Sequence, residues 1–153
     1  MAELEDFQPI EWTESMATGI DVIDKQHQYL VGTLQDANSR LLADDDNQVL
    51  SRVVKDLLRY AITHFETEES LMQRYDYAIA YPEEARIHIS QHRVFSRRVV
   101  AFSNQIRERQ AVSRIEILKF LNYWLHNHVS GIDQQLGIFL KQKMGEPDGK
   151  IRQ

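Results

Sequence analysis

The sequence predicts an all-α protein, an up-down-up-down antiparallel four-helix bundle with an N-terminal arm. Apolar residues recur every three or four positions through most of the chain, which is the period of an amphipathic helix, and prolines and glycines are few and lie at the edges of these segments. With 153 residues and 42% hydrophobic content, the chain has room for one domain with a real core. The predicted boundaries are an arm over 1–19, the bundle over 20–141 and a flexible tail over 142–153.

The first two predicted helices cover residues 20–42 and 48–75. Aspartates and an asparagine at 44–47 break the first pattern and offer side-chain oxygens that suit capping of the second helix. In both segments an inward seam repeats at spacings of three and four. The first seam is Ile20, Ile23, His27, Leu30, Leu34, Ala37 and Leu41, and the second is Val53, Leu57, Ala61, His64, Glu68, Leu71 and Tyr75.

The third predicted helix covers 82–109 and the fourth follows a short loop. Pro82 suits the first turn of a helix, and Ser113 with Glu116 forms a capping-box pattern at the start of the fourth. Trp12 in the arm is expected to pack on the bundle surface or to plug one end. The third seam is Ala85, His88, His92, Phe95, Val99, Phe102 and Ile106, and the fourth is Ile117, Leu121, Trp124, His128, then Gly131 or Ile132, and onward to Phe139.

Composition excludes several classes of function. A net charge of -5 argues against nucleic-acid binding, and the arginines of the third segment are interpreted as a solvated face. No apolar run approaches the length of a membrane span, so no membrane insertion is expected. The first residues lack the pattern of a secretory signal, which makes the cytoplasm the expected location. Without cysteine, any metal must be held by nitrogen and oxygen.

Five of the six histidines fall at inward positions that would otherwise be apolar: His27, His64, His88, His92 and His128. Glu68 occupies another inward position. A single inward histidine is usually a core residue with one hydrogen-bond partner. Unpaired buried polar groups cost about 1 to 3 kcal/mol each, so five histidines and a carboxylate would strain a metal-free core. A shared cation removes that cost, because it gives every lone pair a partner.

The spacing within two helices favours metal ligation. His64 with Glu68, and His88 with His92, are four residues apart and therefore share one helix face. Asp133 is less clear, because it lies five residues after His128 and about 140° around an ideal helix from it. Geometry alone leaves two interpretations of Asp133 open. It is either a solvated aspartate or a ligand that a local π-bulge turns inward.

Four segments of the chain resemble the hemerythrin family, in particular its bacterial members, over roughly 10–141. Val129 stands where isoleucine is common in the family, and a polar tail follows the last helix. The resemblance therefore covers most of the chain and all seven candidate ligand positions. The four segments are Ile23-Asp24-Lys25-Gln26-His27, His64-Phe65-x-x-Glu68-Glu69-x-Leu71-Met72, His88-x-x-x-His92 and Trp124-Leu125-x-x-His128-Val129-x-x-x-Asp133.

The resemblance implies a cofactor of two non-haem iron ions (Fe²⁺/Fe³⁺) with a bridging oxide or hydroxide. It assigns His88, His92 and His128 to one iron, and His27 and His64 to the other. Glu68 and Asp133 bridge both irons, which selects the ligand interpretation of Asp133. His126 matches no ligand position. The first iron then has six ligands and the second has five, which leaves an open position for a small molecule.

The function that the resemblance implies is reversible dioxygen binding, for storage, delivery to oxygen-requiring enzymes, or sensing, without catalysis. Five residues match family positions around the oxygen pocket: Leu30, Phe65, Trp124, Leu125 and Val129. They also suit ordinary core packing. One alternative is a di-iron enzyme, such as an oxidase, a peroxidase or a nitric oxide-handling protein. Carboxylate-rich di-iron oxidases usually carry paired Glu-x-x-His motifs, and this chain has none. The other alternative is an iron or oxygen redox sensor module.

Overall fold

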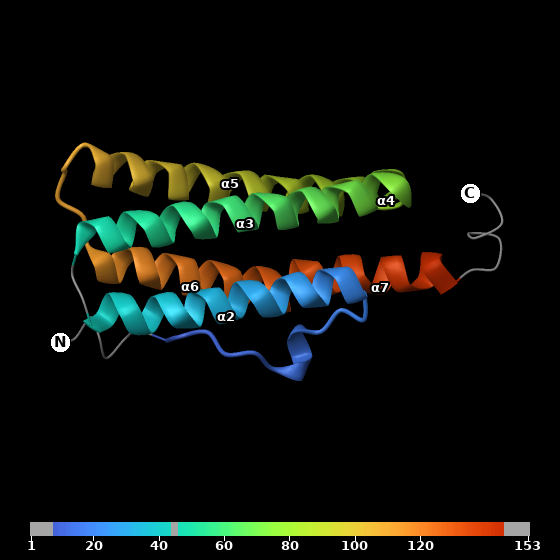
Figure 1. The fold of residues 1–153 in the computed structure, drawn as a ribbon. Coiled ribbons are helices and arrows are strands. Elements are labelled where there is room, and N and C mark those ends of the chain that lie inside the picture. The colour runs from blue at the N-terminus through green and yellow to red at the C-terminus, as the bar shows by residue number, and fades with distance from the viewer. Residues whose placement is uncertain (1–7, 44–45, 146–153) are drawn as a thin grey trace.

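The structure, a computed structural model, describes residues 8–43 and 46–145, and all of its regular elements there are helices. The elements are the 3₁₀ helix η1 (Glu14–Met16) and the α-helices α2 (Asp21–Ala43), α3 (Asn47–Arg74), α4 (Tyr77–Ala80), α5 (Pro82–Arg107), α6 (Arg114–Ser130) and α7 (Ile132–Gly145). The long helices form four columns, which are α2, α3, α5, and α6 continued by α7. Figure 1 shows α3 beside α5 and α2 beside α6. The predicted all-α four-helix bundle is confirmed.

The predicted helix starts are confirmed at three sites. The Asp46 carboxylate accepts a hydrogen bond from the backbone N–H of Gln48 at 2.8 Å and so caps α3. Ser113 accepts from the N–H of Glu116 at 3.2 Å at the start of α6. Pro82 is the first residue of α5, where its missing N–H costs no helical hydrogen bond. Residues 44 and 45, part of the predicted capping run, lie outside the described residues.

Three features differ from the sequence-based expectation. The short helix α4 lies in the stretch that was expected to be a connection between helices. Its Tyr77 is buried in the smaller of the two core clusters. The fourth column is not one helix but two, because the backbone leaves helical geometry at Gly131. Helix α7 runs to Gly145, four residues beyond the boundary predicted for the bundle. The rest of the predicted tail, 146–153, lies outside the described residues.

The N-terminal arm lies along the α2–α6 side of the bundle (Figure 1). Its Ile10 is buried, and Trp12 packs against the larger core cluster from the side, as predicted for a residue on the bundle surface. Asn122 anchors the arm by accepting a hydrogen bond from the N–H of Ile10 at 2.9 Å. Asn122 also exchanges two 2.8 Å hydrogen bonds with Asn38, which links α6 to α2.

The apolar core consists of two clusters with the polar site between them. Along α2, His27 lies between Ile23, which belongs to the smaller cluster, and Leu30, which belongs to the larger one. The smaller cluster contains Ile20, Ile23, Met72, Tyr77, Ala85, Leu136, Phe139 and Leu140. Within the described residues, no helix combines the length and the apolar character needed to cross a membrane.

Candidate metal centre

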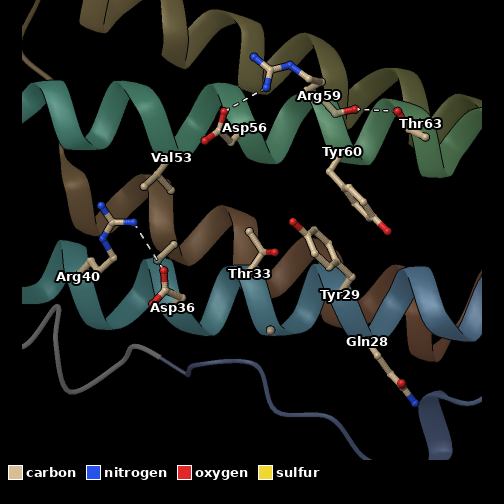
Figure 2. Close-up of a pocket in the computed structure, with 12 residues that line it drawn as sticks. Gln28, Tyr29, Thr33, Asp36, Arg40, Val53, Asp56, Arg59, Tyr60 and Thr63 are labelled. Carbon is tan, nitrogen blue, oxygen red and sulfur yellow. Dashed lines mark hydrogen bonds and ion pairs between the residues drawn. The ribbon is translucent and has the colours of Figure 1, made fainter.

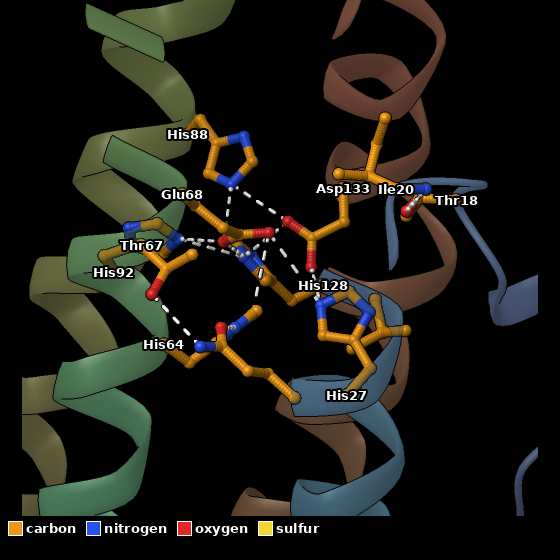
Figure 3. Close-up of polar contacts among 12 residues, drawn as sticks. Thr18, Ile20, His27, His64, Thr67, Glu68, His88, His92, His128 and Asp133 are labelled. Carbon is orange, nitrogen blue, oxygen red and sulfur yellow. Dashed lines mark hydrogen bonds and ion pairs between the residues drawn. The ribbon is translucent and has the colours of Figure 1, made fainter. Parts of the chain in front are cut away.

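The structure brings all seven predicted ligand side chains together in the middle of the bundle (Figure 3). They come from α2, α3, α5, α6 and α7, so every column of the bundle contributes. Each of the seven is at most 2% exposed: His27, His64, Glu68, His88, His92, His128 and Asp133. His126, in contrast, is exposed, as expected for a residue off the inward seam.

The seven side chains form two groups, each of which could hold one metal ion. The ligand atoms within each group lie within 4.8 Å of one another. The larger group is Glu68, His88, His92, His128 and Asp133, and the smaller one is His27, His64, Glu68 and Asp133. Both carboxylates belong to both groups, which is the arrangement that a pair of bridging ligands requires.

Asp133 directs one oxygen to each group. Its Oδ2 lies 2.8 Å from His27 Nε2, while its Oδ1 lies 2.9 Å from His88 Nε2 and 3.1 Å from His128 Nε2. Figure 3 shows this carboxylate between the rings of His27 and His88. Each oxygen of Asp133 therefore faces the nitrogens of a different group.

Glu68 divides its oxygens in the same way. Its Oε1 lies 3.0 Å from His92 Nε2 and 3.3 Å from His88 Nε2, on the side of the larger group. Its Oε2 lies 3.6 Å from His64 Nε2 and 3.8 Å from His27 Nε2, on the side of the smaller group. Each carboxylate therefore places one of its two oxygens in each group, so both carboxylates could bridge two ions.

Several of these buried atoms have no hydrogen-bond partner. The atoms are Nε2 of His27, Nε2 of His64, Oε2 of Glu68 and both carboxylate oxygens of Asp133. They lie near one another, but they are not aligned as donor and acceptor. Each buried orphan costs about 1 to 3 kcal/mol, and a cation at the point where the lone pairs converge would satisfy them together. The nitrogen and oxygen donors therefore fit a transition-metal ion such as iron.

Three of the histidines donate their outer ring nitrogen, Nδ1, to a side chain from a neighbouring helix. These bonds leave Nε2 as the free lone pair that points inward, and they fix the orientation of each ring. The pairs are His64 with Gln26 Oε1 at 2.6 Å, His92 with Glu69 Oε2 at 2.8 Å and His128 with Gln91 Oε1 at 2.8 Å.

Sequence reasoning did not assign a role to any of these three partners. The signal that could have found them is their position, because each is adjacent in sequence to a ligand candidate yet supports a histidine on the next helix. Gln26 illustrates how firmly they are held. Its Nε2 donates to Thr67 Oγ1 at 3.1 Å, and this hydroxyl donates to the carbonyl of Thr63, so the amide oxygen must face His64.

Burial sets the charge of the histidines. Loss of solvent lowers the pKa of His64 to about 3, with a further contribution from the nearby His27. Burial likewise lowers the pKa values of His92 and His128. These imidazoles are therefore neutral at pH 7, which is the form that ligates a metal.

The pKa values of the two carboxyl groups are shifted in opposite directions. Burial, together with the charge of Asp133, raises the pKa of Glu68 well above its usual range. Burial alone would also raise the pKa of Asp133, but the contacts with His128, His27 and His88 outweigh it and hold that pKa well below its usual range. Without a metal, Asp133 is therefore ionised, and the site resists ionisation of Glu68 as well.

Asp133 reaches the site because the fourth column is interrupted just before it. Gly131 adopts φ -110° and ψ -91°, helix α6 ends at Ser130, and α7 restarts at Ile132. A Cβ at Gly131 would lie 2.8 Å from the carbonyl oxygen of Asn127, so this geometry requires glycine. The hypothesis of a π-bulge in a continuous helix is therefore wrong in its details, although a local irregularity does turn Asp133 inward.

Comparison with known proteins identifies the family of the chain. A family model described as the hemerythrin HHE cation binding domain matches residues 18–137. The chain belongs to the hemerythrin family. A bacteriohemerythrin of Pseudomonas paraeruginosa is 29% identical over 138 residues, covering 88% of this chain and 84% of the relative. A bacteriohemerythrin of Stenotrophomonas maltophilia is 30% identical over 125 residues, covering 80% and 76%.

More distant matches include a relative found by its sequence and a solved structure found by its fold. A hemerythrin-like protein of Naegleria gruberi is 24% identical over 127 residues, covering 83% of this chain and 90% of the relative. A crystal structure of wild-type hemerythrin superimposes with a TM-score of 0.77 at 21% identity, covering 87% of this chain and 98% of that one. At this identity the structural likeness supports the fold, a four-helix bundle.

In this hemerythrin-family chain, a small internal cavity lies beside the metal centre. It has room for about one water-sized sphere, with a volume of about 10 Å³. Four of the five predicted pocket residues line it, namely Leu30, Phe65, Trp124 and Leu125, together with Leu34, Leu57, Ala61, Phe95 and Leu121. The fifth, Val129, is fully buried but does not line the cavity.

Two aromatic rings connect this cavity to the histidines. Phe65 stacks on His92 with ring centroids 4.0 Å apart, and Trp124 stacks on His128 at 4.4 Å. Both rings therefore contact a ligand candidate on one side and line the apolar cavity. An apolar wall of this kind excludes water from the space beside the metal centre.

A much larger hollow lies elsewhere, on the outer side of α2 and α3 (Figure 2). Its volume is about 880 Å³, and its walls include the paired rings of Tyr29 and Tyr60, whose centroids are 4.2 Å apart. None of the seven metal-centre side chains lines it. The volume of a hollow is therefore no guide to the polar site, which lies in the bundle interior.

Proposed function

We propose that this chain is a reversible dioxygen-binding protein that uses two non-haem iron ions with a bridging oxide or hydroxide. The observation that carries the proposal is the unequal pair of groups, five protein ligands in one and four in the other, with both carboxylates shared. If one bridging oxygen is added to each, one iron has six ligands and the other five. When bound, the iron pair supplies reversible electron transfer and one open coordination position.

The residues of the chain have distinct parts in this proposal. His88, His92 and His128 would hold one iron, while His27 and His64 would hold the other. Glu68 and Asp133 would contribute to both. The neutral imidazoles offer their Nε2 lone pairs, and the side chains on Nδ1 keep them pointed inward.

The surroundings favour binding over catalysis. Apolar and aromatic side chains line the small cavity beside the centre, so this flank of the site is apolar and excludes water. Exclusion of water also limits the proton supply that an oxidase or a peroxidase reaction would need. We therefore propose a non-enzymatic role in storage, sensing or delivery to oxygen-requiring enzymes, with the cytoplasm as the location.

The experiment is a visible spectrum of the anaerobically reduced, iron-loaded protein before and after air. The proposal expects colour to develop in air and to bleach under vacuum over repeated cycles, with two irons per chain by metal analysis. A His126→Ala variant serves as a matched control, because this exposed histidine lies outside both groups. Oxidation within one cycle, with stoichiometric release of peroxide, would instead support an oxidase or a redox sensor.

A further inference from the structure

The interruption between α6 and α7 is held by one side chain, that of Gln134. Its Nε2 donates to the carbonyl oxygen of Val129 at 3.0 Å and to that of Met16 at 3.1 Å. The first bond satisfies a carbonyl near the end of α6, where the helical partners are lost. The second reaches the N-terminal arm, 118 residues away in sequence. One amide thus joins three segments of the chain.

The arm is packed tightly where Gln134 meets it. Thr18 lies against α7 so closely that a Cβ at Gly137 would be 2.8 Å from the Cβ of Thr18 and 3.2 Å from its carbonyl oxygen. Thr18 is also fixed to the start of α2, because its N–H and its hydroxyl each donate to Asp24 Oδ1 at 2.7 Å. The arm at residues 16–18 is therefore a rigid support rather than a loose cover.

This support lies directly next to the metal centre. Asp133 is the residue before Gln134, and Figure 3 draws Thr18 and Ile20 on the Asp133 side of the site. The two oxygens of Asp133 face different groups. A small rotation of the first turn of α7 would therefore move at least one oxygen away from its group. A shift of one residue turns a helix by about 100°, which shows how sensitive the carboxylate is to the geometry of the break.

We propose that Gln134 is a positioning residue for the metal centre. By donating to the end of α6 and to the arm at once, it fixes the start of α7 and thereby the bridging orientation of Asp133. The inference rests on the proposed di-metal centre, to which it adds the arm as a structural part. No other side chain among the described residues is found to hydrogen-bond both the arm and the end of α6.

The test compares substitutions that keep or remove the donor. Gln134→Glu has nearly the same shape but turns an acceptor toward two carbonyl oxygens, whereas Gln134→Lys keeps a donor. Gln134→Leu repeats the loss without adding a charge. The matched control is Gln35→Ala, because Gln35 Nε2 also bonds the arm, at the carbonyl of Ile10 at 3.3 Å, but lies away from the break.

The readout is anaerobic titration of the metal-free proteins with Co²⁺, which reports the number of ions bound, their affinities and the visible absorption of each site. Far-UV circular dichroism of the metal-free proteins checks that each variant folds. Gln134→Glu and Gln134→Leu are expected to weaken binding of the second ion about tenfold or more, as loss of an outer support typically does. Gln134→Lys is expected to restore it, and Gln35→Ala to stay near the wild type.

The inference would be overturned if Gln134→Glu kept the wild-type Co²⁺ affinity and spectrum. It would also be overturned if Gln134→Glu and Gln35→Ala lost Co²⁺ affinity equally, because that result would indicate general loosening of the arm. These results are separable from failure of the proposed function. That failure would appear in the wild-type chain, as binding of a single ion or as the absence of reversible colour with dioxygen.

Discussion

Removal of the metal should make the protein sensitive to mild acid. In the metal-free protein, His64 has a pKa of about 3, and the pKa values of His92 and His128 are also lowered by burial. In the unfolded chain each histidine has a pKa of about 6.5. Because protons bind the unfolded chain preferentially, the free energy of unfolding should fall as the pH drops below that value.

The slope of the free energy of unfolding against pH can be estimated from the number of protons taken up on unfolding. If all three histidines stay neutral in the folded state, unfolding takes up three protons at pH values below about 6. Glu68 has the opposite sign, because its raised pKa lets the folded protein hold a proton that the unfolded chain releases above about pH 4.5. Asp133 is ionised in both states in this range, since its pKa is lowered. The net uptake is about two protons, which corresponds to about 2.7 kcal/mol per pH unit between pH 6 and 4.5.

The assay is urea unfolding of the chelator-treated protein, followed by far-UV circular dichroism at pH values from 7.5 to 4.5. A loss of a few kcal/mol across this range is large beside a total stability of about 5 to 15 kcal/mol. The metal-loaded protein should resist acid further, because bound ions keep the imidazoles unprotonated.

Two variants sharpen the experiment. His64→Asn should reduce the slope by about one proton, or about 1.4 kcal/mol per pH unit. His126→Ala, which removes an exposed ring, should leave it unchanged. A metal-free protein whose stability is flat or rises as the pH falls from 7 to 5 would refute the reasoning.

Three further variants test the site, with His126→Ala again as a control. His128→Ala should lower iron content to one ion per chain or less, while His126→Ala should retain two; equal losses by metal analysis would mean that the wrong face of α6 has been assigned to the core. Leu125→Ser should destabilise the fold by about 2 to 5 kcal/mol in chemical denaturation, because a buried apolar side chain is lost. It should also hasten the irreversible loss of air-induced colour, since it wets the cavity, and unchanged colour retention over repeated cycles would argue against the dry-wall explanation. Glu69→Gln should weaken metal binding about tenfold in a competition titration with a chelator. Its carboxylate accepts from His92 Nδ1 but is 38% exposed, so a much larger loss would point to a direct ligand role.

The helices were predictable because their seams are long and regular. The period of 3.6 residues places Ile23, Leu30 and Leu34 on one face of α2, and all three are buried. Helix α4 was not predictable in the same way, since four residues are too few to show a period. Its buried Tyr77 packs on the smaller cluster through tertiary contacts that no local pattern records.

The candidate site was predictable to the extent that polar residues interrupt those seams. Five histidines and Glu68 occupy positions where the pattern demands apolar side chains, and the structure gathers them in one place. Their role as iron ligands remains a prediction. The supporting residues Gln26, Gln91 and Glu69 were missed because they lie beside the seam, where polar residues are normal on a helix surface. Only the packing of neighbouring helices shows that each one reaches a histidine.

Asp133 marks the point at which local reasoning fails for a physical reason. A spacing of five residues after His128 cannot place both side chains on one face of a regular helix. The chain resolves this conflict with a glycine whose backbone approaches the carbonyl of Asn127 and with a glutamine amide that satisfies the carbonyl of Val129. The irregular backbone is therefore what allows one carboxylate to face both groups of histidines. A regular helix could have supplied His128 or Asp133 to the site, but not both.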